Sequence, residues 1–89
     1  MAEKAGKPIR FTRHALESMA RRGAFRDEVA ETIRRAAWTP ARSGRFECAL
    51  DFPYNGLWNG KRYATKQVAP VFIEEEDAIV VITAYVFYF

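Results

Sequence analysis

Histidine and cysteine are almost missing from this sequence, which contains one of each among 89 residues. A single cysteine, Cys48, excludes a disulfide within the chain. One Cys and one His are also too few for a zinc cluster built from these two residue types. His14 has no second histidine to share acid–base chemistry with. We therefore expect neither a metal nor a cofactor.

Long apolar runs are missing as well. The longest run spans residues 78–89, well short of the about 20 residues that a membrane helix requires. Residues 1–8 are charged and contain no apolar segment of the kind found in signal peptides. From this pattern we expect a soluble, cytoplasmic protein with no membrane partner.

Hydrophobic residues make up 49% of the chain and aromatic residues 15%, which is ample for a folded core. The length fits one small domain, expected over residues 8–89 after a flexible leader at 1–7. The net charge of +3 is unevenly distributed, because eleven basic and five acidic residues precede Glu47 whereas three basic and six acidic residues follow from there. Such a field can steer nucleic acid or an acidic partner, or it can be ordinary solvated surface.

Two helices are expected in the first half. Apolar residues at helical spacing predict a helix that begins after Thr12, a plausible N-cap, and ends near Arg22. Gly23 supplies the left-handed residue that commonly follows a helix. A second helix is expected over 27–37, where acidic residues come early and arginines late, as the helix dipole favours.

The second half predicts strands. Alternation predicts a first short strand at 8–11, a second at 45–50, and a hairpin formed by 61–73 and 78–87 around an acidic tip at 74–77. Residues 38–44 and 51–60 are expected to be loops. Pro70 predicts a bulge or an edge position in its strand. The last strand is apolar on both faces, so it should lie inside the sheet with both faces covered.

These elements give an α+β fold of order β-α-α-β-β-β, with two N-terminal helices packed on one face of a mainly antiparallel sheet. The block Phe-Thr-Arg-His-Ala-Leu-Glu-Ser-Met-Ala-Arg-Arg-Gly at 11–23 resembles the opening signature of the domain-of-unknown-function family 4258. The Glu-Val pair at 28–29, the Gly-Arg pair at 44–45 and the Thr-Ala-Tyr ending at 83–85 resemble it too, so the resemblance covers nearly the whole chain. Two positions depart from the family pattern: Ser18, where arginine is frequent, and Arg26, where a small capping residue is usual.

The family has no established activity, but it is similar in size and element order to the RelE- and BrnT-type toxins. Those are small ribonucleases that a partner antitoxin inhibits. The resemblance therefore implies a toxin-like, RNA-binding protein, with an antitoxin-like protein as a possible partner.

Cleavage of RNA by its 2′-hydroxyl needs a base, charge stabilisation at the phosphate and a proton donor. His14 could be the base, Arg22 or Lys66 the cation, and Tyr85 the donor. The alternative is structural: His14 and Arg22 bond to carbonyl or carboxylate groups, and Tyr85 belongs to the core.

Arg13, Arg21 and Arg62 are the further candidates for nucleic-acid binding. A second set of candidates is aromatic, and its members could stack on bases, bind a protein partner, or form a lid over the sheet. These are Phe52, Tyr54 and Trp58.

Aromatic residues at the end of the last strand, from Tyr85 to Phe89, would be a costly exposed patch unless something covers them. A homodimer or an antitoxin-like partner could do so. Two functions are therefore predicted: a toxin-like RNA-binding protein or ribonuclease, and alternatively a non-catalytic protein-interaction module that uses the last strand and the aromatic segment.

Overall fold

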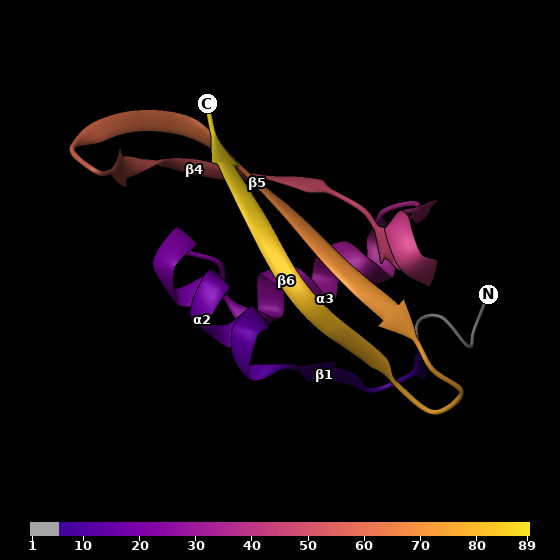
Figure 1. The fold of residues 1–89 in the computed structure, drawn as a ribbon. Helices are drawn as coiled ribbons and strands as arrows, with labels where there is room; N and C mark the ends of the chain where they lie inside the picture. Colours follow the sequence, from indigo (N-terminus) through magenta and orange to yellow (C-terminus); the bar gives the residue numbers. More distant parts are fainter. Residues whose placement is uncertain (1–5) are drawn as a thin grey trace.

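The protein folds as two helices packed against one face of a six-stranded sheet, as a computed structural model that describes residues 6–89 shows (Figure 1). The strands are β1 (Ile9–Phe11), β2 (Thr39–Pro40), β3 (Phe46–Glu47), β4 (Leu50–Trp58), β5 (Lys61–Glu74) and β6 (Ile79–Tyr88). The helices are α2 (Arg13–Arg22) and α3 (Arg26–Arg35), and a 3₁₀ turn, η1, spans Arg42–Gly44. Among residues 6–89, no helix combines the length and the apolar character that crossing a membrane requires.

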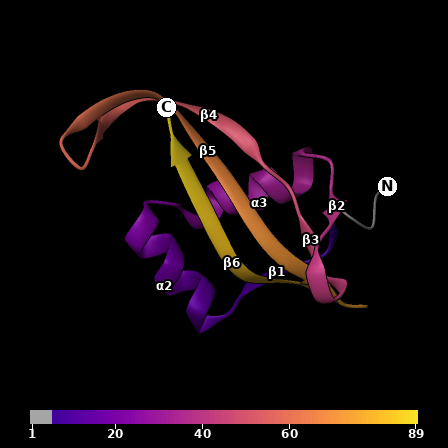
Figure 2. The ribbon, with the colours of Figure 1, turned by 45° about the horizontal axis from the view of Figure 1, so that its top comes forward.

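The order of the sheet is β1-β6-β5-β3-β2, and β4 also pairs with β5. Among the strand pairs of residues 6–89, only β1–β6 is parallel, with Ile9 opposite Ile79, and the others are antiparallel. Figure 2 shows β3 and β2 extending the sheet beyond β5. The predicted α+β fold, with two N-terminal helices packed on one face of a mainly antiparallel sheet, is confirmed.

Both predicted ends of the first helix are confirmed. The Thr12 hydroxyl accepts a hydrogen bond from the Ala15 amide at 3.0 Å, and Gly23 has a φ of 85°. The second helix begins one residue earlier and ends two residues earlier than predicted. Its first turn is fixed by the Glu28 carboxylate, which accepts from the Phe25 amide at 3.0 Å.

The core lies between the helices and the sheet. Ala15 and Met19 of α2 and Val29 and Ile33 of α3 are buried there. They pack against the buried residues of β5 and β6, which are Val68, Phe72, Ile79, Val81 and Ala84. Trp38 closes one end, with its ring edge-on to Phe72 at 4.8 Å between centroids. Removing this apolar surface from water is the main stabilising contribution, at about 25 cal/mol per Å².

The prediction of a loop over 51–60 is wrong, because most of this segment forms β4. Asn55 has a φ of 47°, and the pairing with β5 shifts register between Pro53 and Gly56. The first Asn-Gly pair is therefore a bulge within the strand, and the second, Asn59-Gly60, is the turn of the β4–β5 hairpin. The predicted strand 45–50 is split into β3 and the start of β4, and the predicted loop 38–44 contains β2 and η1.

The break between β3 and β4 accommodates Pro70. It is fully buried in β5, an interior strand, and its carbonyl accepts from the Cys48 amide at 3.4 Å. Since the N and the carbonyl of one strand residue point to the same side, the missing N–H of Pro70 faces the break between β3 and β4. The sheet also shifts register next to it, between Val71 and Phe72. Of the two predicted alternatives, the bulge is confirmed near Pro70, and β5 is not an edge strand.

The last strand lies inside the sheet as predicted, between β1 and β5. The prediction that both of its faces are covered is wrong for its C-terminal half. Tyr85 and Phe87 point away from the helices and are 45% and 52% exposed.

Candidate functional site

The face of the sheet that points away from the helices, here called the open face, carries a row of exposed aromatic side chains. Tyr85 and Phe87 come from β6, and Phe89 continues the ladder through hydrogen bonds with Thr65 in both directions at 2.8 and 3.0 Å. Alternate residues of a strand share a face, so the three rings lie in line. Phe89 is 57% exposed. We call Tyr85, Phe87 and Phe89 the aromatic row.

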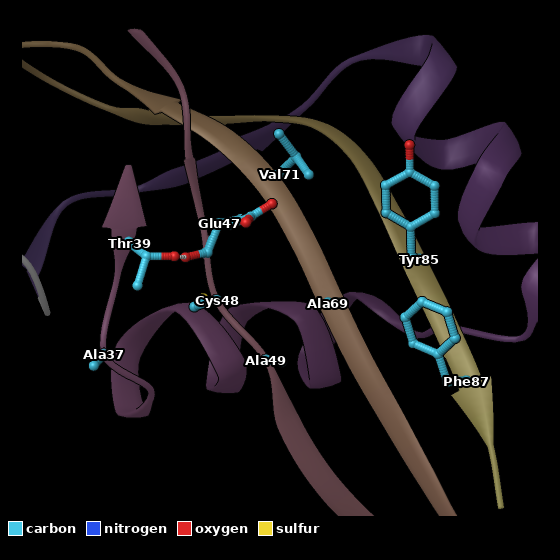
Figure 3. A pocket seen from close by; sticks show the side chains of 9 residues that line it. All are labelled: Ala37, Thr39, Glu47, Cys48, Ala49, Ala69, Val71, Tyr85 and Phe87. Atoms are coloured by element: carbon cyan, nitrogen blue, oxygen red, sulfur yellow. Dashed lines mark hydrogen bonds between the residues drawn. The ribbon is translucent and has the colours of Figure 1, made fainter. Parts of the chain in front are cut away.

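Beside the aromatic row the open face is hollowed (Figure 3). The hollow has a volume of about 380 Å³, and Ala49, Ala69 and Val71 contribute to its lining from the middle of the sheet. Tyr85 and Phe87 stand on one side of it, and Thr39 and Glu47 lie on the other. A volume of this size lies within the range of small-molecule sites, about 300–1,000 Å³.

A second hollow of about 360 Å³ adjoins the first, because Glu47, Val71 and Tyr85 line both. Two arginines, Arg42 and Arg45, line it from the 3₁₀ turn. The turn is tight, since the Arg45 amide donates to the Arg42 carbonyl at 3.1 Å, and the two residues between them have positive φ. Both arginine side chains therefore come from one short turn at the margin of the open face.

Arg22 lies at the opposite margin. Its guanidinium donates to the Ala84 carbonyl at 2.9 Å and lies 4.8 Å from the centre of the Tyr85 ring. The structure thus brings Arg22 and Tyr85 together, as the predicted site requires. It also realises the structural alternative for Arg22, a bond to a backbone carbonyl.

His14 lies farther along α2 and is exposed. Its Nε2 is 3.4 Å from the Ser18 hydroxyl, which accepts a hydrogen bond from Thr83 of β6 at 3.2 Å. His14 and Arg22 are eight residues apart, or about 12 Å along the helix axis at about 1.5 Å per residue. The side chains of His14 and Arg22 therefore do not meet in one site.

Lys66 is on the other face of the sheet and is only 4% exposed. Its Nζ donates to the Gly23 carbonyl at 2.7 Å and forms an ion pair with Glu28 at 2.9 Å. The Phe25 ring centre lies 4.7 Å from the same ammonium. Lys66 connects the turn between α2 and α3 to β5, and it does not meet Tyr85.

The aromatic residues predicted to bind a partner also lie towards the helices. Phe52 packs against the core. Trp58 stacks on Tyr88 with centroids 4.7 Å apart, and Tyr54 meets the same ring edge-on at 5.2 Å. All three are half-buried. Burial first, then the neighbouring Tyr54 and Glu28, raises the pKa of the Tyr88 hydroxyl from 10.0 to about 12.

The remaining predicted nucleic-acid contacts are exposed but scattered. Arg13 and Arg21 stand at the two ends of α2, and Arg62 is on the β4–β5 hairpin. Residues 6–89 hold no group of three or more His, Cys, Asp or Glu side chains placed to bind a metal.

Sequence reasoning missed most of the open-face site. The sequence indicates Phe87 and Phe89 only as part of an apolar patch to be covered, and it predicts no role for Arg42, Arg45 and Glu47. The alternation of aromatic residues at 85, 87 and 89 was the available signal, because it places three rings on one face. Nothing in the local sequence indicates that η1 lies beside that row.

Comparison of the chain with protein-family models, with curated proteins and with solved structures found no match. The arrangement itself can hold flat apolar groups on the aromatic row and anionic groups at both margins. It offers no convergent acid–base pair.

Proposed function

We propose that this domain binds single-stranded RNA on the open face of its sheet. The observation that carries the proposal is the exposed aromatic row, flanked by Arg22 on one side and by Arg42 and Arg45 on the other. Bases stack on aromatic side chains, at about 1–3 kcal/mol each, whatever their identity. Guanidinium groups bind phosphates and stack on rings, which suits the two margins.

The resemblance of residues 11–23 to the domain-of-unknown-function family 4258, and through it to small ribonuclease toxins, favours the same class of ligand. The positive net charge of +3 acts in the same direction, because it attracts polyanions at low salt. The proposal differs from the sequence-based hypothesis in its residues: the contacts come from the sheet rather than from α2.

Cleavage is a separate hypothesis. The predicted residues lie on both faces of the sheet, with Lys66 buried beneath the helical turn and His14 about 12 Å along α2 from Arg22. Expression of the chain alone tests cleavage: a ribonuclease toxin would slow growth, and His14→Ala would relieve the effect. Normal growth together with intact cellular RNA would leave binding as the activity.

Binding is tested with a fluorescein-labelled RNA of twelve nucleotides containing all four bases, by fluorescence anisotropy at 50 mM salt. The test variant is Tyr85→Leu/Phe87→Leu, which removes two π faces but keeps apolar side chains. We expect its affinity to fall at least about tenfold, because each lost stack costs about 1–3 kcal/mol.

The matched control is Phe25→Leu, which removes an exposed aromatic ring (65% exposed) from the helical side of the molecule. Its affinity should stay within about twofold of wild type, within the range usual for a surface substitution away from the binding site. Failure of the wild-type protein to bind at low salt would refute the proposal. An equal loss of RNA affinity in Tyr85→Leu/Phe87→Leu and in Phe25→Leu would show that the aromatic row is not the binding site.

The apolar lining of the first hollow favours a second candidate, docking of a protein such as a second copy or an antitoxin-like partner. If a protein docks here, the Tyr85→Leu/Phe87→Leu variant should keep its affinity for that partner, because leucine retains the apolar surface. Sedimentation equilibrium checks the homodimer: a dimer that Val71→Asp dissociates would support it, and a monomer at high concentration would exclude it.

A further inference from the structure

We infer that the carboxylate of Glu47 makes the open face select guanine over other bases, an inference that depends on the proposed RNA binding. Glu47 lines both hollows, together with Tyr85 and Val71. Figure 3 shows its side chain directed across β5 from the edge of the hollow opposite Tyr85. A base stacked on Tyr85 would therefore present its edge towards Glu47.

The carboxylate is free to accept hydrogen bonds. Within residues 6–89 the ion pairs are Lys7–Glu74, Arg35–Glu31 and Lys66–Glu28, and none includes Glu47. The backbone of Glu47 is engaged in the sheet, and its carbonyl also accepts from the Thr39 hydroxyl at 3.3 Å. Glu47 is exposed, so the charged form needs no internal partner.

A bare carboxylate is unfavourable on a face that binds RNA without preference, because it repels phosphates. It becomes favourable when a ligand offers donors to both of its oxygens, since an ionised carboxylate only accepts hydrogen bonds. Guanine carries two adjacent donors on its Watson–Crick edge, the ring N1–H and the 2-amino group. Adenine, cytosine and uracil each have an acceptor beside the donor on this edge. That acceptor would face the second carboxylate oxygen with no proton between the two atoms.

The site thus combines a ring for the base, a two-oxygen acceptor for its edge, and guanidinium groups for the phosphates. Two charge-assisted hydrogen bonds to one carboxylate are strong and directional. Base stacking provides affinity in this arrangement, and Glu47 provides the choice of base. Arg42 and Arg45 line the hollow on the same side as Glu47, where the backbone of the bound nucleotide would pass.

The experiment measures anisotropy with three labelled oligouridylates of twelve nucleotides, which carry guanosine, inosine or uridine at one central position. Inosine keeps N1–H but lacks the 2-amino group. We expect the guanosine oligonucleotide to bind about tenfold more tightly than the uridine one, with inosine between them. The readout is this ratio, because total affinity also responds to net charge.

In Glu47→Gln the guanosine-to-uridine ratio should fall to about one, since an amide presents only one acceptor. Asp51→Asn is the matched control: it removes an exposed carboxylate on β4, which accepts a hydrogen bond from the Gln67 side chain of β5 at 2.8 Å. That variant should keep the wild-type guanosine-to-uridine ratio, although both substitutions remove one negative charge from the protein.

Equal binding of the three oligonucleotides by wild type would overturn the inference while leaving RNA binding intact. A guanine preference that survives in Glu47→Gln would overturn the role of this residue. Absence of binding to any of them at 50 mM salt would refute the proposed function itself.

Discussion

Gly23 is the residue at which α2, β4 and β6 meet. Its φ of 85° ends the helix, and the ring of Trp58 and the hydroxyl of Tyr88 pack against its α-carbon. A Cβ at this position would lie 2.5 Å from Tyr88 Oη and 2.9 Å from Trp58 Cζ3. Glycine is therefore required here for space as well as for backbone conformation.

Gly23→Ala should lower the free energy of unfolding by about 3 kcal/mol, from left-handed strain of about 1 kcal/mol plus overpacking. Gly60→Ala is the control, because Gly60 has nearly the same φ, 81°, and no heavy atom within 4 Å of the added carbon. It should cost only about 1 kcal/mol. Urea unfolding of the two variants checks this, and equal losses would contradict the packing argument.

Tyr88 predicts a pH dependence of stability in the alkaline range. Its pKa is raised to about 12, so above pH 10 the unfolded chain loses this proton before the folded protein does. The stability contributed by the protonated hydroxyl is present below pH 10 and is lost as the pH rises towards 12. The hydroxyl also donates to the Arg22 carbonyl at 2.8 Å.

Tyr88→Phe removes both the hydrogen bond and the titration. We expect the variant to be less stable than wild type at pH 8, and the difference to shrink between pH 10 and pH 12. Urea midpoints at pH 8, 10 and 11.5 measure this. A difference that stays constant over the range would show that the hydroxyl titrates alike in both states.

At the scale of the elements, Lys66 holds the helical turn to the sheet. It is a buried cation on the core face, and it bonds both sides of the α2–α3 connection through Gly23 and Glu28. Glu28 in turn begins α3 by accepting from the Phe25 amide. One side chain thus links the end of α2, the start of α3 and the middle of β5.

Lys66→Met should lower the unfolding free energy by about 2 kcal/mol, because it leaves the half-buried Glu28 carboxylate without its counter-ion and the Gly23 carbonyl without its donor. Lys61→Met, on the same strand but exposed, should change it by less than about 0.5 kcal/mol. Thermal unfolding checks both. If Lys66→Met abolishes RNA binding while the protein stays folded and equally stable, its role is functional instead.

The helices were predictable because their signals are local: the Thr12 cap, the Gly23 stop and apolar residues at helical spacing. β4 was missed because Pro53 and Asn55-Gly56 indicate turns, whereas the sheet absorbs them as an edge proline and a bulge. Pairing with β5 decides the outcome, and local sequence does not encode pairing.

The site was predictable in part. The sequence predicts Arg22 and Tyr85 as members of one catalytic set, and the two side chains do lie together, but it does not predict their place beside the aromatic row. Lys66 alternates with Val68, Pro70 and Phe72, so the period of two could have placed it on the buried face. The position of η1 beside the aromatic row depends on long-range packing, and no local pattern reveals it.

At the scale of the whole molecule, the proposed interface makes RNA affinity depend on salt. Three guanidinium groups border the open face, and each phosphate neutralised on a single strand contributes about −0.7 to the slope of log K against log salt. We expect a slope of about −2 for wild type. Anisotropy titrations from 50 to 300 mM salt measure it.

Arg42→Gln/Arg45→Gln should reduce that slope to about −0.7. Arg13→Gln/Arg21→Gln, which alters exposed arginines of α2, should leave it near −2. The reverse pattern would place the phosphate contacts on the helix, where the sequence first suggested them.

The central place of β6 has a consequence for synthesis of the chain. Its residues Ile79, Val81 and Ala84 complete the core, and Ile9 of the opening strand pairs with Ile79. α2, which packs mainly on β6, therefore lacks its apolar support until this segment leaves the ribosome, whereas α3 packs on β5. A nascent chain stalled before residue 79 would expose the underside of α2 and become a client for chaperones.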